Sequence, residues 1–373
     1  MMRLTASVMM ALCLFSGTAR AAESMEEIRD EVFPKFGSGL EELASRKDVD
    51  EPTFLETVTF RDAKFQRIIQ ECFEIMSDSP LIDLLALQDE VRDGVRERQE
   101  KLGRLAGESL TAPADSWNPL ATTQESLRRD MEKLRGEIAD MEASLAAQKD
   151  RVYAGIEANG VPLKREQFDA MINAADAVET AKIMAVAGHL RYMLQSMEGQ
   201  VSAPDAPLEM LKMYSGIYMM CYRVYIYAVA NAIVYIEHQY QPRLAEIKKK
   251  NDDLMDESRS LRRQLTSDDD RRTLDSNMAS QKRMDEVIDL YGRYLKKKAK
   301  ELENLNREMG RHYRVAENTY RTIQLSSQLL ELVRTSRSDF SRIFSFRTPE
   351  LGLLLDERLS REFAEVTAAL REH

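Results

Sequence analysis

The sequence predicts an all-α protein, an elongated helical bundle in which long antiparallel coiled-coil hairpins surround a central apolar helix. Glycine and proline are scarce, at 15 and 10 in 373 residues, whereas good helix formers such as Leu, Ala, Glu, Lys and Arg abound. No alternating apolar-polar run bounded by hairpin turns indicates a strand. Apolar residues instead recur at heptad spacing over several long segments, which is typical of paired helices.

The first 21 residues have the organisation of a secretory signal peptide. Arg3 supplies the positive start, Ala6–Phe15 the short apolar run, and Ala19-Arg20-Ala21 an A-x-A cleavage site. Cleavage takes two arginines from the 53 basic residues, which leaves 51 against 63 acidic residues and a net charge of −12. We expect a periplasmic or secreted protein. Its acidity argues against nucleic-acid binding and against attraction to anionic lipid.

The N-terminal region after cleavage, residues 22–119, is expected to hold helices and a linker. Pro34 should break the first helical segment, and a second helix is predicted over 52–76. Ser79 and Pro80 have the residue types of an N-cap and a first helical position, so a third helix should start there and end near residue 105.

Three segments carry the predicted helix-pairing seams. A four-three apolar spacing runs through residues 127–152, and similar seams follow at 244–265 and 274–333. Asn251 occupies a seam position, where an amide fixes register at a cost in stability. A polar turn at 266–270 separates the last two seams, so their simplest arrangement is a hairpin. The predicted domain order is signal peptide 1–21, N-terminal helices and linker 22–119, helical hairpin 120–200, central apolar Tyr-rich helix 207–242, coiled-coil hairpin 243–335 and C-terminal amphipathic helix 336–373.

The stretch Met213–Ile236 is long and apolar enough to span a membrane. Its tyrosines are spread along its whole length, whereas membrane spans concentrate them at the interfaces. A charged Arg223 in the middle also disfavours a span. We therefore expect a helix buried in the protein; a membrane span, or a segment buried until it meets lipid, remain as alternatives. The candidate interaction or insertion residues of this stretch are Tyr214, Tyr218, Tyr222, Arg223 and Tyr225.

Two further groups are candidates for a role. Cys72 and Cys221 lie in apolar helical contexts of a compartment that permits disulfides, so they are either two buried thiols or a disulfide between helices. A turn near 336–347 combines aromatic and basic residues and could serve as a docking site or pack against the end of the bundle. Its candidate interaction residues are Phe340, Phe344 and Phe346.

The sequence carries no enzyme signature. It lacks G-x-S-x-G, a Walker loop, G-x-G-x-x-G, H-E-x-x-H and C-x-x-C. The four histidines lack the Glu-x-x-His spacing of a helical dimetal site, and the carboxylates alternate with Lys and Arg as on solvated helix faces. We expect no catalytic residues, no cofactor and no bound metal.

These observations predict a non-enzymatic scaffold or interaction protein of the bacterial cell envelope, which binds protein partners or itself through its heptad seams. The alternative is a membrane-active protein that inserts residues 213–236. Long helices with one apolar segment in the middle of the chain resemble the layout of the elongated α-helical pore-forming toxins. Such a resemblance implies insertion on contact with lipid. The tyrosines and Arg223 depart from that pattern.

Overall fold

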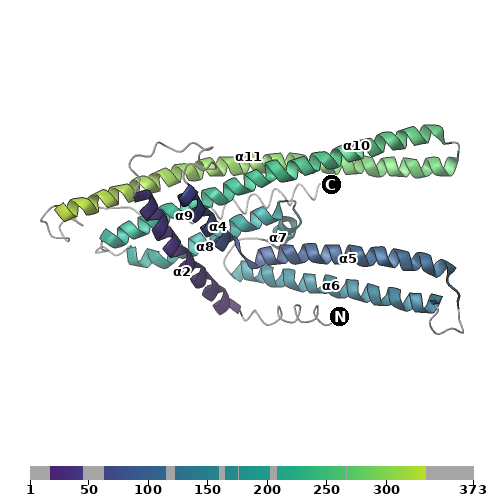
Figure 1. Cartoon of the computed structure of the whole chain (residues 1–373), viewed down its shortest axis with the longest axis horizontal. Helices are drawn as coiled ribbons and strands as arrows, with labels where there is room; N and C mark the ends of the chain where they lie inside the picture. Colours follow the sequence, from purple (N-terminus) through teal and green to yellow (C-terminus); the bar gives the residue numbers. More distant parts are fainter. Residues whose placement is uncertain are drawn as a thin grey trace. The chain divides into compact units, whose positions relative to one another are not determined.

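The fold is all-α. The computed structural model describes residues 17–44, 63–114, 122–158, 164–174, 176–201, 208–265 and 267–332, and within these ranges every regular element is a helix (Figure 1). The all-α prediction is therefore confirmed. Most of the predicted signal peptide and the whole predicted C-terminal helix lie outside the described residues. The helices are α2 (Gly17–Ala44), α4 (Ala63–Ser77), α5 (Pro80–Thr111), α6 (Gln124–Ala158), α7 (Arg165–Ile172), α8 (Ala177–Val201), α9 (Leu208–Tyr235), the π-helix η1 (Ile236–Tyr240), α10 (Gln241–Gln264) and α11 (Asp268–Leu332).

The chain divides into two compact units. The first contains α5, α6 and α7, in which α5 and α6 pack along each other. The second contains α4, α9, η1, α10 and α11, with most of α2 and α8. In this second unit α9 packs against α11 and α4, and α10 packs against α11. The domain boundaries proposed from the sequence stay predictions.

In the first unit, α5 begins where the sequence indicates. The Ser79 hydroxyl accepts a hydrogen bond from the Ile82 backbone N–H at 3.4 Å, and Pro80 occupies the first turn. The helix continues to Thr111, beyond the expected end near residue 105. It approaches α6 closely at Gly94, where an added Cβ would lie 2.5 Å from Met141 Cε. Nearby, Arg98 Nε donates to Glu137 Oε2 at 2.9 Å, so the two helices run in opposite directions.

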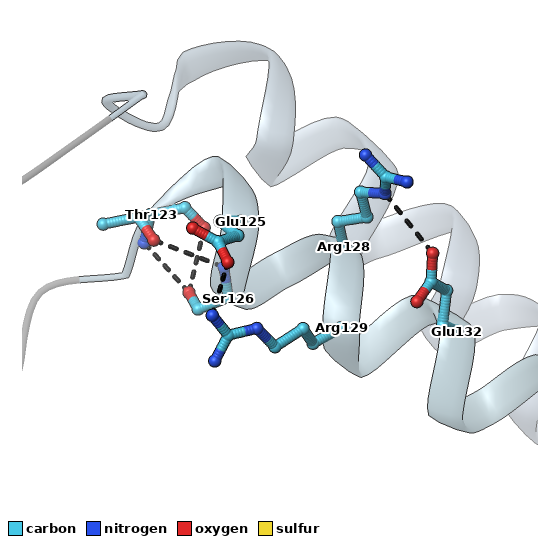
Figure 2. Close-up of polar contacts among 6 residues, drawn as sticks. All are labelled: Thr123, Glu125, Ser126, Arg128, Arg129 and Glu132. Carbon is cyan, nitrogen blue, oxygen red and sulfur yellow. Dashed lines mark hydrogen bonds and ion pairs between the residues drawn. The ribbon is translucent and has the colours of Figure 1, made fainter.

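Helix α6 has a reciprocal cap at its start (Figure 2). The Ser126 backbone N–H donates to Thr123 Oγ1 at 3.3 Å, while the Thr123 N–H donates to Ser126 Oγ at 3.0 Å. This arrangement has the logic of a capping box, with serine in place of the usual Glu or Gln. Ion pairs one turn apart follow, Glu125 with Arg129 and Arg128 with Glu132. The two hydroxyls thus satisfy the backbone N–H groups of Thr123 and Ser126 at the helix start, where N–H groups have no partner within the helix.

In the second unit, α2 runs through Pro34 without a break, so the prediction of separate helical pieces there is wrong. An interior proline costs about 3 kcal/mol or more. Val32 and Phe36 are completely buried on the same helix, and burying two such side chains contributes about 1.5–3 kcal/mol each. Ser38 also donates its hydroxyl to the Pro34 carbonyl at 3.1 Å. Tertiary packing therefore outweighs the proline.

The chain also passes Pro242 as helix. The π-helix η1 stands immediately before that proline, and the Gln241 backbone N–H donates to the carbonyl of Ile236, five residues back. Proline has no N–H to donate, and in a regular helix its ring clashes with the carbonyl four residues earlier. A π turn widens the helix by one residue at this point. The chain therefore continues as helix past Pro242, with a local change of helix type just before it.

Candidate functional site: the tyrosine-rich helix

Helix α9 contains the candidate residues, and its neighbours enclose nearly all of them. From Tyr214 to Ile233 its side chains are buried, except for the half-buried Tyr227 and Asn231. Exposed apolar side chains occur only at its two ends, with Met213 50% and Val234 38% exposed. By length and composition the helix Glu209–Gln264 contains a window apolar enough to cross a membrane, and 83% of that window is buried inside the protein.

Three of the candidate tyrosines form a ladder along α9. Tyr214 stacks on Tyr218 with ring centroids 6.3 Å apart, and Tyr218 meets Tyr222 edge-on at 5.0 Å. The hydroxyls of Tyr218 and Tyr222 hydrogen-bond each other at 2.9 Å. Tyr222 in turn stacks on His312 of α11 at 5.7 Å. Spacing of one helical turn brings these rings together. The hydrogen bond between the hydroxyls of Tyr218 and Tyr222 satisfies polar atoms that burial would otherwise leave unpaired.

Arg223 is 7% exposed, an uncommon position for a charged group. Its guanidinium lies 6.0 Å from the ring centroid of Phe65 on α4 and 5.9 Å from that of Tyr313 on α11. Aromatic faces are negative in their quadrupole and attract a cation. Arg223 therefore sits between the two helices that pack on α9 and contacts both. Tyr225, the remaining candidate on this helix, is 2% exposed.

The two cysteines are buried free thiols in the structure, so the candidate disulfide is not formed. Burial raises the pKa of Cys72 to about 12 and raises the pKa of Cys221 as well. A thiolate is the reactive form of cysteine. Both side chains are therefore packed, unreactive groups in this state. The aromatic candidates Phe340, Phe344 and Phe346 lie outside the described residues.

Burial also raises the pKa values of Tyr218 and Tyr222. The hydrogen bond with Tyr222 raises the pKa of Tyr218 further, and either hydroxyl could be the donor in that bond. Both phenols therefore stay protonated at neutral pH, and the ladder holds no negative charge. It can pack and donate hydrogen bonds, which is the chemistry of a helix-helix contact.

One lysine on the predicted seam of α11 is buried. Lys298 is only 5% exposed. The signal that identifies it is its spacing, since Lys298 lies seven residues after Tyr291 and seven before Leu305 on the seam of the same helix. Among the described residues, no cluster of three or more His, Cys, Asp or Glu side chains could hold a metal ion.

No protein-family model, curated protein or solved structure matches this chain.

Proposed function

We propose that the protein is an exported, non-enzymatic scaffold or interaction protein of the bacterial cell envelope. In this proposal the molecule is elongated, with antiparallel coiled-coil hairpins arranged around the apolar helix α9. Its work is to bind proteins, either partners or a second copy of itself. The observation that carries the proposal is the burial of α9. This helix packs its apolar and aromatic side chains against α4 and α11 rather than presenting them to solvent.

The pairing of α10 with α11 supports the same conclusion. Lys248 reaches Asp285 and Asp289, and Arg262 reaches Asp275, so the two helices run in opposite directions (Figure 1). The amide of Asn251, 1% exposed, donates to the Gln281 carbonyl oxygen at 2.9 Å. A buried amide at such a seam position is a known way to fix the register of paired helices. Long helices of fixed register present rigid surfaces to partners.

A second function, membrane insertion, is favoured by one observation: the α9 region contains a window apolar enough to span a bilayer. Insertion would first have to break the stacking of Tyr222 on His312 and the contacts of Arg223 with Phe65 and Tyr313. It would then place Arg223 in hydrocarbon, at about 2.5–3.5 kcal/mol on insertion scales. Both costs favour the scaffold.

Dye release from liposomes separates the two functions. We expect the purified, folded protein to leave liposomes of neutral and of anionic lipid intact, because α9 is already buried in protein and the net charge is negative. Release of the dye would support insertion instead.

A matched variant identifies the segment responsible for any release. Asn231→Asp changes a half-buried amide for a carboxylate of almost the same shape, and a carboxylate in hydrocarbon costs up to about 2.5–3.5 kcal/mol, the value for the centre of a bilayer. Leakage by the wild type that Asn231→Asp abolishes would assign insertion to α9 and overturn the scaffold. Leakage that the variant retains would place the membrane activity elsewhere in the chain.

Export is tested by expressing the full chain in a bacterium. We expect the protein in the periplasmic or secreted fraction with Ala22 as its first residue, because the A-x-A site ends at Ala21. Cleavage would remove residues 17–21 of α2. Ala21→Asp should block processing, because the cleavage site requires a small residue there. Wild-type protein that stays in the cytoplasm with Met1 attached would contradict the envelope location.

A further inference from the structure

The α10–α11 pair has two unlike faces along its length. At 3.6 residues per turn, Lys248 and Arg262 lie on one side of the buried row of α10 that contains Asn251 and Ser258. Their ion pairs with α11 close that side. The opposite side of both helices carries large apolar side chains in contact with solvent. We call these the apolar face: Ile247, Leu254 and Leu261 of α10, 41%, 52% and 40% exposed, and Met284 and Val287 of α11, 46% and 51% exposed.

The spacing of the apolar face is that of a helix-pairing surface. Ile247, Leu254 and Leu261 are separated by seven residues each, and a row repeating every seven residues is what a partner helix follows. A single exposed leucine would need no explanation. A row over four turns, joined by Met284 and Val287 from the neighbouring helix, indicates a contact surface for further helices.

The charges beside the row of Ile247, Leu254 and Leu261 indicate which helix would pack on the apolar face. On its outer edge α10 carries Lys250 and Glu257, seven residues apart, and both side chains are exposed. If a second α10 lies antiparallel with Leu254 opposite Leu254 of the second copy, then Ile247 lies opposite Leu261 of that copy. The same register brings Lys250 within one residue of Glu257 of the second copy, and symmetry repeats this pair. Apolar row and charges are therefore self-complementary, as a twofold interface requires.

Helix α11 fits the same arrangement. The ion pairs of Lys248 with Asp289 and of Arg262 with Asp275 fix its register against α10. This register places Met284 beside Leu254, near the twofold axis, and Val287 one turn further on. The centre of the apolar face is thus apolar on both helices, and the charges lie at its edge, as in other interfaces with an apolar core and polar rim.

We propose that two copies of this chain associate through the apolar face, with α10 antiparallel to α10 of the second copy and Leu254 on the twofold axis. This inference rests on the proposed scaffold function and names its partner as the chain itself. The row is short, about 21 Å at 1.5 Å per residue, and the interface lies at the small end of specific interfaces. We therefore expect a reversible dimer with a dissociation constant of about 1–100 μM.

Sedimentation of the purified full chain over a range of concentrations tests the dimer. Leu254→Lys should raise the dissociation constant by at least about tenfold, because it removes two apolar contacts at the axis and places two like charges there. Leu110→Lys is the matched control, since Leu110 is 85% exposed on α5 of the other compact unit, and it should leave the dissociation constant unchanged. Thermal unfolding of each variant verifies that it is folded.

Charge reversal tests the register. Lys250→Glu and Glu257→Lys should each weaken the dimer by about tenfold, since each replaces two surface ion pairs by two like-charge pairs. The double variant, with both changes, should restore the wild-type dissociation constant. Single variants that have no effect, or a double variant that is as weak as the singles, would overturn this register.

Cysteine cross-linking adds a geometric test, because Cys72 and Cys221 are buried. Under mild oxidation Leu254→Cys should cross-link to itself, and Ile247→Cys should cross-link only when mixed with Leu261→Cys. Self-cross-linking of Ile247→Cys at the same rate would indicate a parallel pair and overturn the proposal. So would a wild type that remains monomeric at about 200 μM, well above the expected dissociation constant. A monomer that leaves liposomes intact and is cross-linked to another envelope protein in cells would retain the scaffold function while this inference failed.

Discussion

Raising the pH from about 8 to about 11 should unfold the protein in a cooperative transition. The groups responsible are two phenols and two thiols in the core around α9: Tyr218, Tyr222, Cys72 and Cys221. Burial raises the pKa of each of them, to about 12 for Cys72. The unfolded chain releases these protons near the ordinary values, about 8.5 for cysteine and 10 for tyrosine. The folded chain keeps them bound to a higher pH.

The sign follows from proton binding. Above the ordinary pKa values the unfolded state binds fewer protons than the folded state, so the free energy of unfolding falls as the pH rises. Below those values both states are protonated, and the contribution of the four groups is fully present. Each group accounts for about 1.4 kcal/mol per pH unit once its unfolded form is ionised. The fall is steepest above pH 10, where all four groups contribute, and it acts against a typical total stability of only about 5–15 kcal/mol.

The measurement is urea unfolding at a series of pH values, followed by circular dichroism and by the absorbance of tyrosinate. The tyrosinate of Tyr218 and Tyr222, two of the 13 tyrosines in the chain, should form together with the loss of helix rather than before it, because the ladder cannot ionise while it is packed. Tyr222→Phe removes one titrating group, so the fall in stability with pH should become shallower, by at most about 1.4 kcal/mol per pH unit. A slope that the substitution leaves unchanged would show that Tyr222 is not part of this linkage.

The fold class was predictable from the sequence because helix formation depends on composition and spacing that the chain displays directly. The scarcity of glycine and the seven-residue spacing along α11 are local properties. The start of α5 at Ser79 was equally local, since an N-cap and the following proline act within one turn. The helix through Pro34 was not predictable, because the burial of Val32 and Phe36 that outweighs the proline depends on packing between helices.

The candidate site was likewise predictable only in part from the sequence. Tyrosines spaced one turn apart indicated side chains on neighbouring positions of one helix. Their partners could not be deduced, because His312 lies 90 residues after Tyr222 in the sequence. The apolar face could not be predicted from the sequence either, because its residues share the seam spacing of α10. Spacing marks Ile247, Asn251 and Leu254 alike as seam positions, and only the packing shows that Asn251 is buried while the other two remain exposed.

Gly216→Leu should strongly destabilise the second compact unit. Gly216 is on α9 where α2 and α11 approach it, and an added Cβ would lie 2.6 Å from Leu40 Cδ1 and 3.1 Å from Tyr320 Cε2. A glycine in a helix normally costs about 0.5–1 kcal/mol relative to alanine. Overpacking a filled core costs about 1–3 kcal/mol, so here the steric cost should exceed the gain in helix propensity.

Gly310→Ala, on the neighbouring helix α11, should stabilise the protein instead. No heavy atom lies within 4 Å of a Cβ at Gly310 of α11, so alanine there should raise the free energy of unfolding by about 0.5–1 kcal/mol. Gly216→Ala should fall between the two, because the tip of Leu40 can move but Tyr320 is packed. Urea unfolding of the three variants gives the order. Were Gly216→Leu as stable as Gly310→Ala, α2 and α11 could not both pack on α9 at this point, and the enclosure of the tyrosine-rich helix would be wrong.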